Sequence, residues 1–183
     1  MAAALQLKPL TLFVDPSIAL VDGRLRGLLD YWNGKRAGRV MPCRADISPA
    51  EMVMRLPRIA LLNVLNAGQT AADFNVRLSG TGIDDLLGHD FRGSGLTDLL
   101  SNSSAKLVAA ALAALVQHKR PMRFFAHAHL AGNPDAYVEG IALPLGPEGG
   151  PVNMVLLETV SIRQSDRQSF PELRNEGLAA VVS

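Results

Sequence analysis

Two histidines and one glutamate have the residue types and the spacing that metal chemistry requires. The histidines are one residue apart in Met122–Leu130 and the glutamate lies in Ala136–Leu143, and both stretches read as β-strands. Because side chains alternate along a strand, all three would lie on one face of a hairpin, where two imidazoles and a carboxylate can bind a metal ion. The three residues are His127, His129 and Glu139. No residue is evident that would orient the imidazoles, so we expect a hydrogen-bonded polar cluster and no bound metal.

The register of this hairpin depends on its turn. The segment Ala131–Asp135 contains glycine, asparagine, proline and aspartate, which are typical turn residues. With this segment as the turn, the facing pairs on this side of the sheet would be His127 with Glu139, His129 with Tyr137, and Phe125 with Ile141.

The sequence lacks the motifs of familiar enzymes, and we expect no catalytic activity. Gly93-Ser94-Gly95 lacks the spacing of a nucleophile elbow, and Gly80-Thr81-Gly82 lacks the third glycine of a dinucleotide-binding loop. Asp84 and Asp85 are adjacent, so they cannot face each other on a helix. The remaining enzyme hypothesis is a small pocket enzyme like a ketosteroid isomerase, with Glu139 or an aspartate as the base. The order of predicted elements fits that fold poorly.

The composition favours a single globular domain. The chain has 183 residues, 48% of them hydrophobic, which is enough for one core without disulfides. The net charge is +1 and no basic stripe is present, which argues against a nucleic-acid partner. The single cysteine, Cys43, cannot form an internal disulfide, and the longest apolar run, Leu107–Val116, is about half the length of a membrane span. Since the N-terminus also lacks a secretory signal, we expect a soluble, cytoplasmic protein without a membrane partner.

The spacing of apolar residues predicts an α+β domain over residues 22–161. Residues 1–21 have no sustained period and read as an N-terminal extension, and residues 162–183 read as a polar C-terminal tail. Asp22 can cap a helix over residues 24–36, and a long helix is expected to end at His118. The predicted strands are 59–65, 74–78, 122–130, 136–143 and 152–160. This order predicts one five-stranded antiparallel sheet with the middle helices folded over one face.

One face of the predicted sheet carries small apolar residues in the middle of its strands. Such residues either let a helix pack closely or leave room for a ligand. We expect this face to lie under the helices and to line a small-molecule cavity, and the alternative is a dry core without a cavity. The expected lining residues are Val76, Leu78, Phe124, Ala126, Ala128, Gly140 and Ala142.

The other face mixes aromatic and aliphatic residues with the two histidines. It needs a cover, because large exposed apolar patches are rare on monomers. The predicted helix over residues 24–36 has an apolar stripe that would cover this face, either from the same chain or from a second copy. We expect a homodimer that uses this surface. The residues of the helix stripe and of the sheet face are Leu25, Leu28, Leu29, Trp32, Phe125, Tyr137 and Ile141.

Five short motifs resemble a known family. They are Asp30-Tyr31-Trp32, Gly38-Arg39-Val40-Met41-Pro42, Arg44-Ala45-Asp46-Ile47-Ser48-Pro49, Arg77-Leu78-Ser79-Gly80-Thr81 and Gly88-His89-Asp90-Phe91-Arg92-Gly93. Together with the element order, they resemble small bacterial stand-alone PAS proteins over residues 28–160. The resemblance implies a PAS-like five-stranded antiparallel sheet, a role as a sensor in signal transduction, and a homodimer. It does not imply a reaction.

Residue types also bear on the cofactors known from PAS proteins. A photoactive flavin site needs a cysteine in the helical segment after the second strand, and Cys43 precedes the first strand, so we expect no flavin adduct. A haem sensor needs an axial ligand such as a histidine on the long helix. His118 lies at the frayed end of that helix and His89 lies in a loop, so we expect no haem.

These observations predict a stand-alone sensory or regulatory module. It would bind an unidentified small molecule or a signalling protein, and it would signal through its dimer contacts or its N-terminal helix. The alternative is a ligand-free module of the same fold that serves protein interaction or dimerisation.

Overall fold

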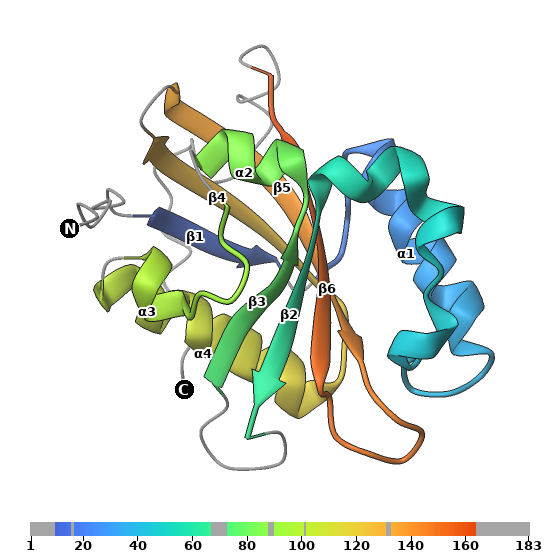
Figure 1. Cartoon of the computed structure of the whole chain (residues 1–183). Coiled ribbons are helices and arrows are strands. Elements are labelled where there is room, and N and C mark those ends of the chain that lie inside the picture. The colour runs from blue at the N-terminus through green and yellow to red at the C-terminus, as the bar shows by residue number, and fades with distance from the viewer. Residues whose placement is uncertain are drawn as a thin grey trace.

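A computed structural model describes residues 10–15, 17–66, 73–87, 90–100, 102–130 and 133–163 (Figure 1). They form one antiparallel sheet with helical segments on both of its faces. The elements are β1 (Leu10–Asp15), α1 (Gly23–Arg36), the 3-10 helices η1 (Arg44–Asp46) and η2 (Pro49–Arg58), β2 (Ile59–Leu65), β3 (Asp73–Ser79), α2 (Thr81–Leu87), α3 (Leu96–Leu99), α4 (Asn102–His118), β4 (Met122–Leu130), β5 (Asn133–Leu145) and β6 (Met154–Ser161). The predicted α+β class is confirmed.

The sheet has six strands in the order β1-β4-β5-β6-β2-β3, and every neighbouring pair is antiparallel. Five of these strands are those predicted from the sequence. The sixth, β1, lies in the segment that we had predicted to be an extension outside the sheet. It pairs with β4, with Leu10 opposite Ala128 and Asp15 opposite Arg123. Local patterns could not reveal this strand because its partner lies more than a hundred residues away in the sequence.

Two helical layers cover the sheet (Figure 1). The segments between β3 and β4, which are α2, α3 and α4, cover one face, as predicted. The first helix, α1, contacts β5 and β6 from the other face, and η2 contacts β6 beside it. We call the face under α2, α3 and α4 the inner face, and the face under α1 and η2 the outer face.

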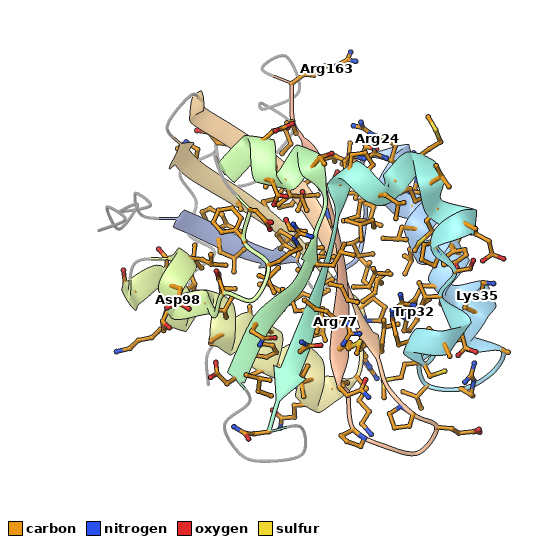
Figure 2. The ribbon with its side chains drawn as sticks, viewed as in Figure 1. Arg24, Trp32, Lys35, Arg77, Asp98 and Arg163 are labelled. Carbon is orange, nitrogen blue, oxygen red and sulfur yellow. The ribbon has the colours of Figure 1, made fainter. Side chains whose placement is uncertain are left out.

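Helix α1 forms where its cap and its apolar stripe predict it. The side chain of Asp22 accepts a hydrogen bond from the backbone N–H of Arg24. The helix is followed by Ala37, whose backbone has the left-handed conformation that commonly ends a helix. Leu25, Leu28 and Trp32 are buried, with exposed fractions of 1% or less. The Nε1 of Trp32 donates to the carbonyl oxygen of Pro144 on β5 at 2.9 Å, and the indole lies between α1 and the sheet (Figure 2). The apolar stripe of α1 therefore covers the sheet of its own chain.

The hairpin of β4 and β5 has a register two residues away from the predicted one. Phe125 faces Glu139, His127 faces Tyr137, and Arg123 faces Ile141. The prediction was wrong because β5 begins at Asn133, so the turn is shorter than the segment 131–135. A shift of two residues leaves every side chain on its predicted face, since side chains alternate with a period of two.

Strand β3 contains an irregularity that changes which residues face inward. Leu61 faces Leu78 and Leu62 faces Val76, so Arg77 has no direct partner and the register shifts at this point. An extra residue of this kind reverses the alternation on its far side. Consequently Ser79, opposite Ala60, lies on the same face as Val76, whereas Leu78 does not.

Candidate functional site

A cavity of about 240 Å³ lies between the inner face of the sheet and the helices that cover it. Every strand contributes to its wall: β4 supplies three of the described lining residues, β2, β3 and β6 supply two each, β1 and β5 supply one each, and the helical side supplies eight. The lining residues on the strands are Leu12, Ala60, Leu62, Val76, Ser79, Met122, Phe124, Ala126, Val138, Leu157 and Thr159, and those on the helical side are Ile83, Phe91, Leu96, Leu99, Leu100, Val108, Ala111 and Leu112. The site is therefore an apolar pocket lined by elements from the whole length of the domain.

Three of the predicted lining residues, Val76, Phe124 and Ala126, line this cavity. Ala142 is fully buried in the sheet but does not reach it. Gly140 faces Phe124 across the strand pair, and a Cβ atom placed on it would lie 2.2 Å from the Cζ atom of the ring. The ring of Phe124 therefore occupies the space that a side chain at position 140 would need.

Leu78, another predicted lining residue, does not line the described cavity. Leu78 is 41% exposed, because the irregularity in β3 turns it away from Val76. Its place on the inner face is taken by Ser79, which the sequence analysis did not select. The side chain of Ala128 lies outside the described residues.

Sequence reasoning also missed lining residues in other segments. Leu12 comes from β1, and no local signal placed that segment in the sheet. Leu157 and Thr159 lie on β6, and the alternation of that strand could have assigned them to the inner face. Phe91, only 2% exposed, lies in the motif Gly88-His89-Asp90-Phe91-Arg92-Gly93 and also lines the cavity.

Behind the cavity wall, on the outer face, lies a buried carboxylate of β5. Glu139 is 1% exposed and accepts hydrogen bonds from the backbone N–H groups of Val21 and Asp22, each at 3.0 Å. The Nε of Arg123, itself 5% exposed, donates to Glu139 at 2.8 Å, and its Nη1 bonds Asp15 at 2.5 Å. Glu139 thus joins β5 to β4 and to the segment that leads into α1, and Arg123 extends the network to β1.

A second buried carboxylate lies on the neighbouring strand β6. Glu158 is fully buried and forms ion pairs with Arg55 at 2.9 Å and Arg58 at 3.1 Å, both from η2. Arg55 also bonds the carbonyl oxygen of Arg24 on α1, and it passes Gly27, where a Cβ atom would lie 2.5 Å from its Nη2. Burial raises the pKa of Glu158 above its ordinary value, although the two arginines act in the opposite direction. Glu158 therefore connects β6 to both α1 and η2.

Two of the three candidate metal ligands, Glu139 and His127, make other contacts in the structure. Glu139 belongs to the buried network, and the ring of His127 stacks on Tyr137 with a centroid distance of 4.0 Å. The side chain of His129 lies outside the described residues. Within the described part of the chain, no group of three histidine, cysteine, aspartate or glutamate residues is arranged to hold a metal ion.

Of the residues considered for cofactors, Cys43 and His118 do not line the cavity. The backbone N–H of Cys43 donates to Asp46 in the connection between α1 and η2, which is not part of the cavity wall. His118 is exposed at the last position of α4. His89 lies outside the described residues.

A family model for the PAS domain matches residues 23–156, which is most of the chain and includes almost all of the elements described above. The chain belongs to the PAS domain family. Domains of this family are generally sensory modules that bind ligands and take part in signalling. The expected resemblance and the PAS-like fold are therefore confirmed, with β1 as an additional strand outside the matched region.

Solved structures similar to this PAS domain include the light state of the blue-light photoreceptor Aureochrome1 LOV, with a TM-score of 0.49 and 8% sequence identity. The match covers 71% of this chain and 99% of that chain. A sensory box histidine kinase/response regulator from Burkholderia thailandensis E264 has a TM-score of 0.43 and 12% identity, covering 69% of this chain and 93% of that one. No curated protein matches the sequence.

One further observation concerns membranes. In the part of the PAS domain chain that the structure describes, no helix is both long and apolar enough to cross a bilayer.

Proposed function

We propose that this chain is a sensory or regulatory module in which a small molecule in the cavity controls how α1 and η2 are held on the sheet. The observation that supports it is the position of the two buried carboxylates. On β6, Glu158 lies between Leu157 and Thr159, which both line the cavity. On β5, Glu139 directly follows Val138, which also lines it.

Neighbouring residues of a strand point to opposite faces of the sheet, so each strand links the cavity to the outer face. A ligand that shifts Val138, Leu157 or Thr159 also moves the backbone that carries Glu139 and Glu158. Those carboxylates bind the segment before α1 and the arginines of η2. Occupancy of the cavity would therefore change the stability of the α1 and η2 layer, which is the surface that a separate signalling partner could contact.

Filling the cavity should remove the ligand. We expect native mass spectrometry of the purified protein to show a non-covalent mass, and we expect Ala126→Phe to lose it, because a phenyl ring would occupy the space beside Phe124. Overpacking of this kind typically costs about 1–3 kcal/mol, so circular dichroism should first establish that the variant is folded.

Leu78→Phe is the matched control, since it adds a ring to the same sheet at a position that is 41% exposed and outside the cavity. Leu78→Phe should still show the mass of the bound ligand in native mass spectrometry. The rate of amide hydrogen exchange over residues 18–36 should also differ between the protein with its ligand and the protein from which the ligand has been removed. A protein without any bound mass, whose exchange over α1 is unchanged in Ala126→Phe, would contradict the proposal.

The alternative of a pocket enzyme with Glu139 as the base loses its support. Glu139 lies on the outer face, and its oxygens accept hydrogen bonds from Arg123 and from two backbone N–H groups. Among the described residues, the cavity wall contains no carboxylate or histidine that could act as a base.

The homodimer is the second part of the proposal. The dimer interface cannot use the predicted stripe of α1, because Leu25, Leu28 and Trp32 are buried against their own sheet. The outer layer instead exposes two adjacent apolar residues of η2, Val53 at 60% and Met54 at 84%, and a second copy of this layer would shield them. We expect light scattering at micromolar concentration to give a dimer mass, and Met54→Glu to shift it toward the monomer. A monomeric mass for the unaltered protein would refute the dimer.

A further inference from the structure

The cavity wall offers a ligand apolar contacts and almost no hydrogen bonds. Among the described lining residues only Ser79 and Thr159 have polar side chains, and almost no polar atom is accessible from the cavity. The Oγ of Ser79 is itself buried within the protein. A polar or charged group placed in the cavity would lose its hydration without gaining a partner, which is very unfavourable. Only the apolar part of a ligand is therefore expected inside.

The cavity is partly open to solvent, and the exposure of the surrounding residues places the opening beside β1. Val14 of β1 faces Phe124 on the inner face and is 39% exposed. Leu12, the residue of β1 that lines the cavity, is half-buried. Toward the opposite edge of the sheet, by contrast, Val76 and Leu62 are only 6% and 4% exposed. A ligand would therefore enter beside β1.

The cavity also extends across the width of the sheet. Its wall includes Leu12 from one edge strand, β1, and Val76 from the other edge strand, β3, together with residues of the four strands between them. Neighbouring strands lie about 4.8 Å apart, so the five spacings between these edges amount to about 24 Å along the sheet. An elongated apolar space that is open at one end suits an aliphatic chain, because the chain can fill its length while a polar end stays in water.

We propose that the cavity binds the aliphatic chain of an amphiphile, which enters beside β1 and leaves its head group in the solvent. The chain makes the apolar contacts that the wall offers, and a solvated head group needs no partner from the protein. This inference rests on the proposed function, because it names the class of ligand that the sensory cavity takes. It predicts that the affinity depends on the length of the chain and hardly on the charge of the head group.

Octanoate and decanoate test the dependence on chain length by isothermal titration calorimetry on the full chain, below their critical micelle concentrations. Decanoate should bind about 15-fold more tightly, because each additional buried CH₂ group contributes about fourfold. Equal affinities for the two anions would overturn the proposal.

Variants of the wall place the chain in the cavity. Ala126→Phe on β4 and Ala111→Phe on α4 each add a ring to the wall and should abolish the binding of decanoate, once circular dichroism has shown that they are folded. Leu78→Phe, at a position outside the wall, should bind decanoate like the unaltered protein. Undiminished binding by both folded wall variants would overturn the proposal.

Three compounds with the same ten-carbon chain test the role of the head group: decanoate, 1-decanol and decyltrimethylammonium. Their dissociation constants should agree within about threefold, because each head group stays in water, where salt at about 0.15 M screens the charges of the protein surface. A larger difference would show that the protein recognises the head group and would overturn the proposal.

Val14→Lys tests the position of the opening. A cation beside the emerging head group should tighten decanoate and weaken decyltrimethylammonium by roughly two- to fivefold at low salt, and it should leave 1-decanol unchanged. Leu65→Lys is the matched control, because Leu65 is also 39% exposed but lies on β2 and is not part of the cavity wall. If Val14→Lys had no more effect than Leu65→Lys, the proposed entry beside β1 would be wrong.

The outcomes separate this inference from the proposed function. If no probe binds but the purified protein carries a ligand mass that Ala126→Phe removes, the ligand class is wrong and the proposed function stands. If no probe binds and no such mass is found, both are wrong. Where a ligand mass is found, its value distinguishes a single-chain amphiphile from a two-chain membrane lipid, and a bound compound without an aliphatic chain would overturn the inference.

Discussion

Replacing Glu139 by alanine should lower the free energy of unfolding by about 3–5 kcal/mol, as expected when one partner of a buried ion pair is removed. The change leaves the buried guanidinium of Arg123 with Asp15 alone and removes the acceptor for the N–H groups of Val21 and Asp22. Each of these partly buried N–H donors, once left without its acceptor, adds a cost of its own. Urea unfolding followed by far-UV circular dichroism measures the difference.

Two comparisons show whether this loss comes from the buried network. Arg92→Ala removes the exposed ion pair with Asp90, whose side chains are 65% and 48% exposed, and should cost far less stability than Glu139→Ala, because solvent screens an exposed pair. The double variant Arg123→Met/Glu139→Leu should be more stable than the sum of its single variants implies, because it removes both charges together. A loss in Glu139→Ala as small as that in Arg92→Ala would show that the carboxylate does not hold the segment before α1.

Replacing Trp32 by alanine should also cost about 3–5 kcal/mol, the usual range for removing a large buried aromatic side chain. The indole is 1% exposed, and its Nε1 bonds the carbonyl oxygen of Pro144. Since α1 has little else of this size against the sheet, we also expect faster amide hydrogen exchange over Gly23–Arg36 than in the unaltered protein. Urea unfolding and hydrogen exchange by mass spectrometry test the two expectations separately.

Two further variants test whether the loss of stability in Trp32→Ala comes from removing the packed indole. Trp32→Phe keeps a ring but loses the bond to Pro144, so its loss of stability should lie between those of the unaltered protein and Trp32→Ala. Val40→Ala, at a position that is 60% exposed, should change stability by no more than about 0.5 kcal/mol. If Trp32→Ala destabilised the protein no more than Val40→Ala, the packing of α1 on the sheet would not be a stabilising contact.

Both predictions concern the attachment of the same layer to the sheet. Trp32 holds the C-terminal half of α1, and Glu139 holds the segment before its first turn. Glu158 adds the contact to η2. In the proposed function this attachment changes with the state of the cavity, so variants that weaken it should also respond more strongly to a ligand.

The amino-acid sequence by itself determined most of the elements and, outside the irregular part of β3, the faces on which their side chains lie. Asp22 predicted the start of α1, and the apolar spacing predicted Leu25, Leu28 and Trp32 as its buried residues. The strand β2 was predicted with the bounds that the structure gives it, Ile59–Leu65. Caps, turns and alternation act between residues that are close in sequence, so a single sequence contains them. Even the wrong register of β4 and β5 left the faces correct, because an error of two residues preserves the alternation.

Only the tertiary structure decided the features that depend on contacts between distant segments. The strand β1 was assigned to an extension because its partner, β4, follows it by more than a hundred residues. Leu78 was placed in the cavity because the extra residue in β3 appears only when that strand is paired with β2. The roles of Glu139 and Glu158 likewise depend on Arg123, Arg55 and Arg58, which the fold brings to them. Pairing, bulges and buried ion pairs are set by which segments meet in space, and local spacing does not determine that.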